Sequence, residues 1–185
     1  MANERGMLRF SSVFYRHWAV LLRNKQQYPR ARETVENSIA TARQSKQRNI
    51  LNNALLARIQ IDLADQSIEP KGYKKQIEKI IADSRRLGMP RIETEALRIY
   101  AQMILAENDR VLAGKYAAEA AAVANRSGLR LHKLSALYVY GDALIKREQF
   151  DFARDLLGQT SRESERRSYH SLMSRISEIS RFIPA

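Results

Sequence analysis

Arginine side chains at a regular spacing carry the clearest chemistry in this sequence. Arg9, Arg16 and Arg23 are seven residues apart, and on a helix this spacing holds three side chains on one face with about 20° of drift per step. Guanidinium groups make paired, charge-assisted hydrogen bonds with carboxylates and phosphates. The row therefore favours an acidic ligand, although an ordinary solvated helix face has the same pattern.

Signals of catalysis or metal binding are nearly absent. The sequence has no cysteine, which excludes disulfides, iron–sulfur clusters, Cys-ligated zinc and thiol nucleophiles. His17, His132 and His170 are far apart, and none has a glutamate three residues before it, as a Glu-x-x-His metal motif requires. The HExxH, GxSxG and Gly-rich phosphate-binding motifs do not occur. We therefore expect a protein that is not an enzyme and that uses no metal or cofactor.

The composition is that of a basic globular protein. Its 185 residues include 32 Lys and Arg against 20 Asp and Glu, a net charge of +12, and 44% are apolar, enough for one domain over residues 1–185. No apolar run reaches the roughly 20 uncharged residues of a membrane helix, so we expect a cytoplasmic protein without a membrane partner. The Arg-rich, acid-poor N-terminus also has the composition of a mitochondrial transit peptide, but the repeat described below favours a folded first helix.

The positive charge is concentrated near the N-terminus. Residues 1–61 hold 11 Lys and Arg against three Glu, a net charge of +8, whereas residues 62–185 hold 21 basic against 17 acidic residues, a net charge of +4. A local excess of this kind indicates one basic surface rather than a uniform coat of charge.

The sequence repeats with a period of 40 to 42 residues. Forty residues from Gly88 align without a gap with forty residues from Gly128. Each unit has a marked position in its first half and a second one 12 or 14 residues later. These pairs are Ala19 and Ala31, Ile59 and Tyr73, Ala101 and Ala113, and Gly141 and Ala153. Two extra residues in the second unit predict a longer loop at residues 67–72.

Each unit is predicted to be a pair of helices, because its apolar residues recur at intervals of three and four. Pro29, Pro70 and Pro90 suit helix starts, and Gly88 and Gly128 suit helix ends. The expected helices span residues 8–23, 28–45, 48–66, 71–87, 91–107, 110–127, 130–147, 150–166 and 168–183. The pattern thus predicts an all-α solenoid of about four antiparallel hairpins, with units at 8–47, 48–89, 90–129 and 130–167 and a C-terminal capping helix.

Small residues at the marked positions allow two helices to cross closely. In the first unit we expect Ala19 to face Ala31, within a packing stripe that also holds Tyr15, Trp18 and Leu22. The second unit lacks small residues at these places, which predicts a splayed or register-shifted helix pair.

These residues resemble the tetratricopeptide repeat. The match is Tyr15, Trp18, Ala19, Leu22, Ala31 and Val35 in the first unit, and Leu137, Tyr140, Gly141, Leu144, Ala153 and Leu157 in the last. The period exceeds that family's usual 34 residues and is similar to the long-helix variant in the repeat domain of the maltose-regulon activator and related bacterial signalling ATPases. The resemblance covers about residues 10–166 and implies a packing scheme rather than one function.

The resemblance also implies a concave groove lined by first-helix residues beside the packing stripe. Carried over position by position, these are Arg16, Val20, Arg23, Asn53, Leu56, Gln60, Leu63, Arg98, Gln102, Leu105, Tyr138, Asp142 and Ile145. A register shifted by one residue would place the leucines in the core instead. The residues expected to bind the partner are Arg9, Arg16, Arg23, Asn53, Gln60, Arg98, Gln102 and Tyr138. The family's chaperone-tail clamp needs a Lys and an Asn where this chain has Arg16 and Val20.

These observations favour a non-catalytic interaction or scaffold module that binds an extended, acidic peptide or partner segment. Arginines would attract the ligand, and amides would pair with its backbone. Two alternatives stay open: nucleic-acid binding through the basic N-terminal third, and a regulatory or sensor role within a larger signalling ATPase or transcription activator. Helical-repeat readers of RNA carry base-reading side chains in every unit, a regularity that this sequence lacks. Apolar surface at either end would allow self-association.

Overall fold

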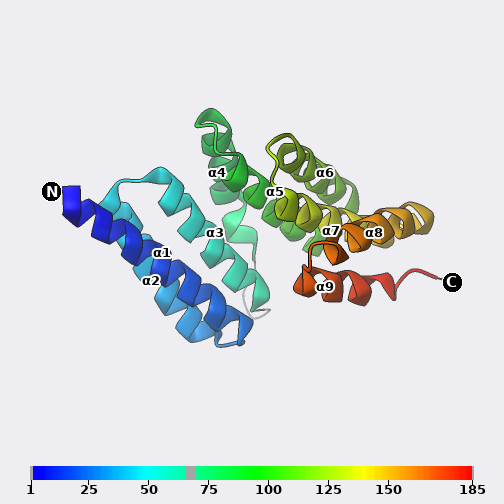
Figure 1. Cartoon of the computed structure of the whole chain (residues 1–185), viewed down its shortest axis with the longest axis horizontal. Helices are drawn as coiled ribbons and strands as arrows, with labels where there is room; N and C mark the ends of the chain where they lie inside the picture. Colours follow the sequence, from blue (N-terminus) through cyan, green and yellow to red (C-terminus); the bar gives the residue numbers. More distant parts are fainter. Residues whose placement is uncertain (1, 66–69, 185) are drawn as a thin grey trace. The chain divides into compact units, whose positions relative to one another are not determined.

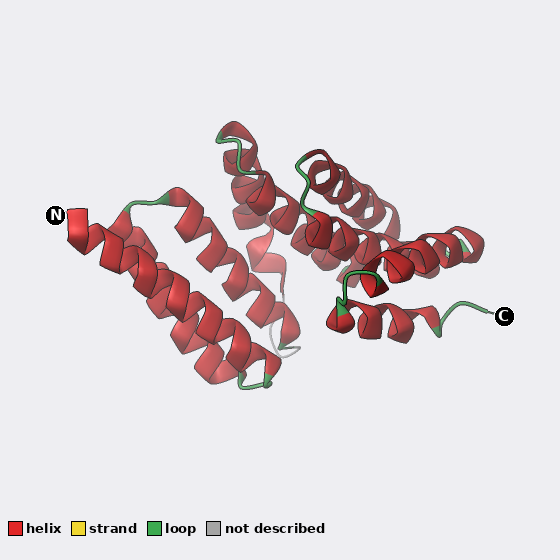
Figure 2. Ribbon diagram, viewed as in Figure 1, coloured by secondary structure: helices red, strands yellow, loops and turns green. Residues whose placement is uncertain are grey.

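The computed structural model describes residues 2–65 and 70–184, and over these ranges the chain is all-α, as predicted (Figure 2). The described part contains nine α-helices and one 3-10 helix (Figure 1). Their bounds are α1 (Ala2–Asn24), α2 (Tyr28–Ser45), α3 (Arg48–Ala64), η1 (Pro70–Tyr73), α4 (Lys74–Arg86), α5 (Pro90–Ala106), α6 (Arg110–Arg126), α7 (Arg130–Lys146), α8 (Phe150–Glu165) and α9 (His170–Ser180).

Six of the nine predicted helices have both ends within two residues of the observed ones. The first helix begins at Ala2 rather than at residue 8, because the segment before Met7 has too few apolar residues to show a period. The fourth helix is preceded by η1, and the last helix is shorter than predicted at both ends. The predicted loop at 67–72 lies partly outside the described residues.

The turns between helices share one backbone design. A residue with positive φ follows the helix end at Gln26, Lys46, Gly88, Asn108, Gly128, Glu148 and Ser168. At residue 128, the N–H of Leu129 donates to the carbonyl of Ala124, a Schellman hydrogen bond that satisfies a carbonyl at a helix end. The helix ends predicted at Gly88 and Gly128 are thus confirmed. From Gly88 onward these positions are 20 residues apart, so each helix with its turn occupies half of the 40-residue period.

The chain forms two compact units, which are described separately. Unit 1 comprises residues 1–83 and unit 2 residues 84–185, so that the division falls inside α4. In unit 1, α1 packs against α2 and α3, and α2 packs against α3 (Figure 1). The apolar cluster between these helices comprises Ala19, Leu22, Ala31, Val35, Ala57 and Ile61. Ala19 and Ala31 are fully buried, as close crossing of the first helix pair requires.

Unit 2 packs its helices in chain order. α5 contacts α6 and α7, and α7 contacts α6, α8 and α9. Each helix therefore contacts its neighbour in the sequence, and alternate helices also meet, which is consistent with the predicted helical repeat. The cluster at the C-terminal end of unit 2 comprises Leu134, Leu144, Ile145, Ala153, Leu157, Leu172 and Ile176.

Glycine is required at position 141 by packing. A Cβ atom at this position would lie 2.4 Å from Leu157 Cδ2 and 2.7 Å from Leu157 Cγ. Leu157 is itself buried, at 1% exposure. The small residue predicted at this crossing of α7 and α8 is therefore one into which a neighbouring side chain fits.

The second hairpin differs from the others at both marked positions. Ile59 is fully buried on α3, where the other units have alanine or glycine. Tyr73 ends η1 instead of lying inside an α-helix, and α4 begins one residue later. Ile77 on α4 is nevertheless fully buried, four residues after Tyr73, just as buried Val35 follows Ala31.

Some predicted side-chain positions need correction. Trp18 does not belong to the packing stripe, because 46% of its surface is exposed; it lies at the edge of the stripe and turns outward. Leu56, Leu105 and Ile145 are buried, so they belong to the core rather than to a groove. Leu63 is half-buried.

Candidate functional site

The predicted arginine row lies on α1, with its residues two helical turns apart. Arg9 is exposed, whereas Arg16 and Arg23 are half-buried. Arg23 Nη1 donates a hydrogen bond to Gln60 Oε1 on α3 at 3.2 Å, and its Nη2 donates to Asn24 Oδ1 at 2.9 Å. The structure therefore brings together an arginine and an amide that are 37 residues apart in the sequence.

The amide row lies on α3. Asn53 is two helical turns before Gln60, as Arg16 is before Arg23, and Asn53 Nδ2 donates to the carbonyl of Asn49 at 2.8 Å. Because α1 packs against α3, the two rows form one polar surface within unit 1. We call it the α1–α3 surface; it comprises Arg9, Arg16, Arg23, Asn53 and Gln60.

Arg98 in unit 2 has a different environment. Only 8% of its surface is exposed, and its guanidinium donates to both carboxylate oxygens of Glu95, at 2.7 and 3.1 Å, and to Gln102 Oε1 at 2.8 Å. Burial lowers the pKa of Arg98, but the charge and hydrogen bond of Glu95 outweigh it, so that the pKa is raised. Arg98 and Gln102 are thus neighbours, and the charge of Arg98 is balanced within the chain.

Tyr138 on α7 is half-buried and covered on one face by a cation. The guanidinium carbon of Arg175 on α9 lies 4.3 Å from the centre of the Tyr138 ring, within the range of a cation–π contact. Because α9 was assigned a capping role only, the sequence gave no reason to pair Arg175 with Tyr138. A base or aromatic ligand stacking on this face would have to displace Arg175.

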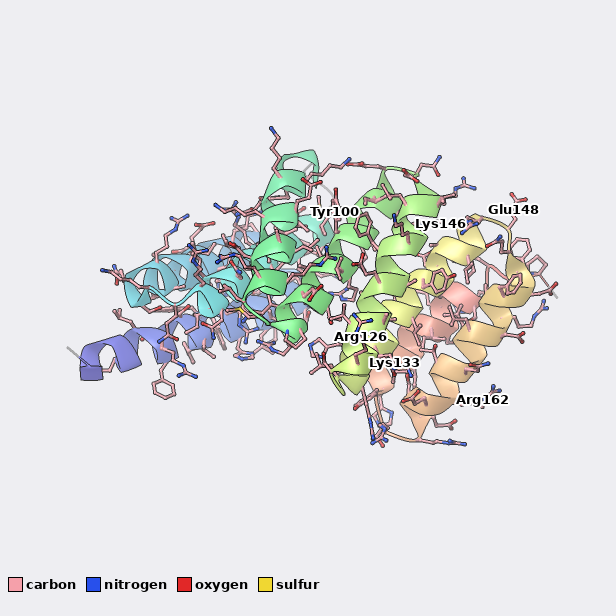
Figure 3. The ribbon with its side chains drawn as sticks, turned by 90° about the horizontal axis from the view of Figure 1, so that it is seen from above. Tyr100, Arg126, Lys133, Lys146, Glu148 and Arg162 are labelled. Atoms are coloured by element: carbon pink, nitrogen blue, oxygen red, sulfur yellow. The ribbon has the colours of Figure 1, made fainter. Side chains whose placement is uncertain are left out.

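Two ionisable side chains on α7 have shifted pKa values. Burial lowers the pKa of His132, with Glu95 opposing this and Arg91 and Arg98 adding to it. Burial raises the pKa of Asp142, partly offset by Lys146, whose Nζ lies 3.9 Å from Asp142 Oδ1. Figure 3 shows Lys146 at the C-terminal end of α7. Both shifts arise from burial rather than from a cluster of catalytic groups.

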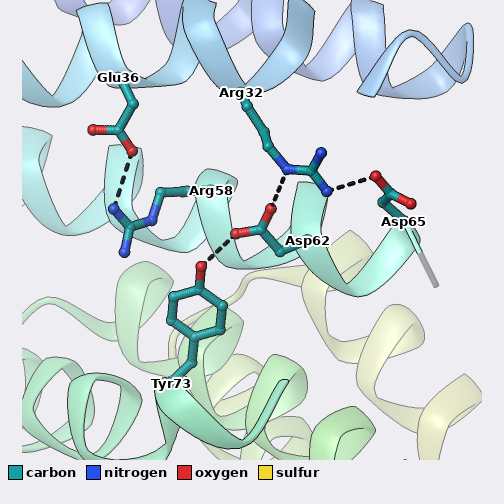
Figure 4. A network of polar contacts seen from close by, with 6 residues as sticks. All are labelled: Arg32, Glu36, Arg58, Asp62, Asp65 and Tyr73. Carbon is teal, nitrogen blue, oxygen red and sulfur yellow. Dashed lines mark hydrogen bonds and ion pairs between the residues drawn. The ribbon is translucent and has the colours of Figure 1, made fainter. Parts of the chain in front are cut away.

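A polar network in unit 1 links α2, α3 and η1 (Figure 4). Arg32 Nε donates to Asp62 Oδ1 at 2.7 Å, and Arg32 Nη2 donates to Asp65 Oδ2 at 2.5 Å. The Tyr73 hydroxyl donates to the other oxygen of Asp62. Burial, followed by the hydrogen bond to Asp62, raises the pKa of Tyr73.

Arg58 completes this network. Arg58 Nη1 donates to Glu36 Oε1 at 3.0 Å, and its guanidinium carbon lies 5.4 Å from the centre of the Tyr73 ring. The network joins three helical segments and serves packing. Sequence reasoning missed it, although Asp62 stands out as the one acidic residue within the apolar run 59–63.

Searches for other kinds of site give sparse results. Among the described residues, no three His, Asp or Glu side chains lie close enough to hold a metal ion. No helix of the described chain has the length and apolar character needed to cross a membrane. Surface pockets of about 490 and 690 Å³ in unit 2 are lined by residues 154–184 rather than by the predicted binding residues.

Comparison with known proteins assigns no family. The sequence matches no protein-family model and no curated protein. The structure itself establishes an all-helical fold whose hairpins pack in sequence.

Proposed function

We propose that this chain is a non-catalytic, tetratricopeptide-like interaction module whose α1–α3 surface binds an extended acidic segment of a partner protein. The observation that carries the proposal is the pairing of a basic row on α1 with an amide row on α3, joined where Arg23 donates to Gln60 at 3.2 Å. Guanidinium groups suit the carboxylates of such a ligand, and primary amides suit the N–H and C=O groups of its backbone.

The charge distribution supports unit 1 as the binding region. Unit 1 holds 15 Lys and Arg against eight Asp and Glu, a net charge of +7, although it is the shorter unit. In unit 2, the buried Arg98 is already paired with Glu95. A basic surface attracts acidic partners over a Debye length of about 8 Å at physiological salt, so that most of the attraction would come from unit 1.

The packing beneath this surface supports a preformed site. Ala57 and Ile61 of α3 belong to the same apolar cluster as Ala19 and Leu22 of α1, and Ile61 is fully buried. The two rows are therefore held on rigid helices rather than on loops. Because the site would already be ordered, mainly the partner segment would lose conformational freedom on binding.

Fluorescence anisotropy with a labelled oligoglutamate peptide tests the proposal. The double variant Arg16→Glu/Arg23→Glu should weaken binding at least tenfold, which corresponds to about 1.4 kcal/mol. The matched control is Arg126→Glu/Arg130→Glu, which makes the same change in net charge at exposed positions of unit 2; Figure 3 labels Arg126. Equal weakening by the two double variants would reduce the effect to net charge and overturn the proposal.

Nucleic acid is the competing ligand class, motivated by the net charge of +12 and a pI near 10.2. The same assay with a labelled oligothymidylate of equal length separates the two. Nucleic-acid binding falls linearly on a log–log plot against salt concentration, and stacking aromatics normally strengthen binding to single strands. Tighter binding of oligothymidylate than of oligoglutamate, with loss in the Tyr138→Ala variant, would replace the proposed function with nucleic-acid binding.

A further inference from the structure

α1 carries a second apolar stripe, which faces away from the core of unit 1. Its members are Met7, Phe10, Phe14, Trp18 and Leu21, exposed by 70%, 75%, 63%, 46% and 52%. They follow one another at intervals of three, four, four and three residues, the spacing of one helix face. Single exposed apolar residues are ordinary, but a contiguous row of this size indicates an interaction surface.

The stripe is palindromic about Phe14. Phe10 and Trp18 lie four residues on either side, and both are aromatic. Met7 and Leu21 lie seven residues on either side, and both are aliphatic. An identical helix that ran antiparallel across Phe14 would therefore place aromatic against aromatic and aliphatic against aliphatic. This self-complementarity is what an isologous two-fold interface requires.

We propose that a second copy of this chain docks on the stripe, with the two α1 helices antiparallel about a two-fold axis at Phe14. Phe14 would face Phe14 of the other copy, Phe10 would face Trp18, and Met7 would face Leu21. Antiparallel neighbours also place each helix N-terminus near the other's C-terminus, the favourable arrangement of their dipoles.

The exposed area is sufficient for such a dimer. Aromatic side chains present about 150–250 Å² each, so the three aromatic and two aliphatic residues at their observed exposures offer roughly 600 Å² per molecule. Two copies would together bury roughly 1,200 Å², the lower end of the range for specific interfaces. Flanking polar residues of α1 would add to this area.

The charge pattern favours a protein copy over an anionic membrane. Between Met7 and Leu21, the only charged residues of α1 are Arg9 and Arg16, and these lie about 150° around the helix from the stripe. Interfacial membrane helices instead place Lys and Arg beside the apolar face. The uncharged stripe is thus a face on which two molecules of net charge +12 can approach each other.

The absence of cysteine makes disulfide trapping a direct test of the geometry. In the antiparallel dimer, the numbers of facing residues add to 28. The single variant Phe14→Cys should therefore form a disulfide-linked dimer, and a mixture of Met7→Cys and Leu21→Cys proteins should link to each other. Two Met7→Cys copies would be separated by about 21 Å along the axis, beyond the roughly 7 Å limit between linked Cα atoms.

A charge substitution tests the dimer without cysteines. Sedimentation of the wild-type chain should show a monomer–dimer equilibrium that higher salt strengthens, because salt screens the repulsion between two basic molecules. Phe14→Glu places two carboxylates face to face and should shift the dissociation constant at least tenfold, with helix content by circular dichroism unchanged. The matched control is Phe152→Glu, at a position on α8 with 71% exposure, which should leave the equilibrium unchanged.

Trp18 provides an independent readout, because it is the only tryptophan in the chain. Its emission should move to shorter wavelength as protein concentration rises, in step with the dimer fraction, and this shift should be absent in Phe14→Glu. A wild-type chain that stays monomeric at all concentrations would overturn the proposal, as would linking of Met7→Cys to itself. Co-flotation with phosphatidylserine vesicles that Phe14→Glu abolishes, in place of dimerisation, would assign the stripe to a lipid surface.

Discussion

Unit 1 and unit 2 hold their helix pairs together by different means. In unit 2, small residues let helices approach, and Gly141 admits the side chain of Leu157 against the α7 backbone. In unit 1, polar side chains take part in the contacts: Ser12 Oγ donates to the carbonyl of Ser38 at 2.9 Å, and Ser38 Oγ donates to the carbonyl of Ser12 at 2.7 Å. Both serines are fully buried, so that each hydroxyl depends on the other helix for its hydrogen bond.

The difference is greatest at the second hairpin. Ile59 occupies a position where close crossing needs a small residue, and Tyr73 occupies the other. The network of Arg32, Asp62 and Tyr73 lies where these departures occur (Figure 4). The comparison teaches that one repeat period can be kept while the contact between helices changes from apolar interlocking to hydrogen-bonded ion pairs.

Ile59→Ala should have the largest effect on stability. The same alanine that suits the equivalent positions in the first and third units would leave a cavity at Ile59, which is fully buried. Loss of this side chain should lower the free energy of unfolding by about 2–5 kcal/mol. Urea unfolding followed by Trp18 fluorescence measures it, since the single tryptophan lies in unit 1.

Leu63→Ala is the control for this cavity, since Leu63 is only half-buried on the same helix and should cost less. A stability of Ile59→Ala equal to that of the wild type would show that α3 and its neighbours close the space. The second hairpin would then tolerate a small residue as the other hairpins do, and the contrast between the units would disappear.

Asp62→Asn should have the next largest effect. Asp62 accepts hydrogen bonds from Arg32 and Tyr73, and its side chain is 6% exposed. Hydrogen bonds to a charged group contribute about 1.5–3 kcal/mol, and Arg32 would keep Asp65, so we expect a loss of about 1–3 kcal/mol. Asp65→Asn removes an ion pair from the same arginine at a more exposed site and should cost less than 1 kcal/mol. Equal losses would reduce the network to surface electrostatics.

Gly141→Ala tests the apolar interlocking of unit 2. The new Cβ would clash with Leu157, at an expected cost of about 1–2 kcal/mol. In the Leu157→Ala background the clash is gone, so Gly141→Ala should stabilise by up to about 1 kcal/mol through helix propensity. Chemical denaturation of the four proteins, followed by circular dichroism, gives this coupling.

Gly158→Ala on α8 is the matched control, because a Cβ atom there would meet only Arg162 Nη1, at 4.0 Å. It should stabilise the protein by up to about 1 kcal/mol in either background. Destabilisation by Gly141→Ala that persists without the Leu157 side chain would contradict the interlocking.

Much of the fold could be predicted because the local signals agree with the packing. The period and the glycines at positions 88 and 128 located the helix ends, since a left-handed residue there follows from backbone geometry. The misplacement of Trp18 has a physical reason: α1 has two apolar faces, and periodicity alone does not tell which face is buried. The row from Met7 to Leu21 is as regular as the buried one.

The candidate site was predicted only in part. The pairs Arg23 with Gln60 and Arg98 with Gln102 lie together, because flanking positions of a repeat follow from its register. Burial of Arg98 was not predictable from its residue type, since arginine is rarely buried without a partner. Glu95, three residues earlier, supplies that partner, and a helical spacing of three was the available signal.

Tyr73→Phe should have the smallest effect and a distinct pH dependence. It removes one hydrogen bond to Asp62, at a cost of about 0.5–1.5 kcal/mol near neutral pH. Because burial and Asp62 raise the pKa of Tyr73 above its ordinary value of 10, the stability that the neutral hydroxyl contributes is present below pH 10 and is lost as pH rises through the folded-state pKa.

The difference in unfolding free energy between the wild type and Tyr73→Phe should therefore shrink in alkaline solution, because ionised Tyr73 can no longer donate to Asp62 and its charge repels the carboxylate. Urea titrations of both proteins on either side of pH 10 measure this difference. In Asp62→Asn, the Tyr73→Phe substitution should show a weaker pH dependence, since the repelling carboxylate is gone. A difference that stays constant with pH in both backgrounds would remove Tyr73 from the network, and the second hairpin would then rest on the Arg32 ion pairs alone.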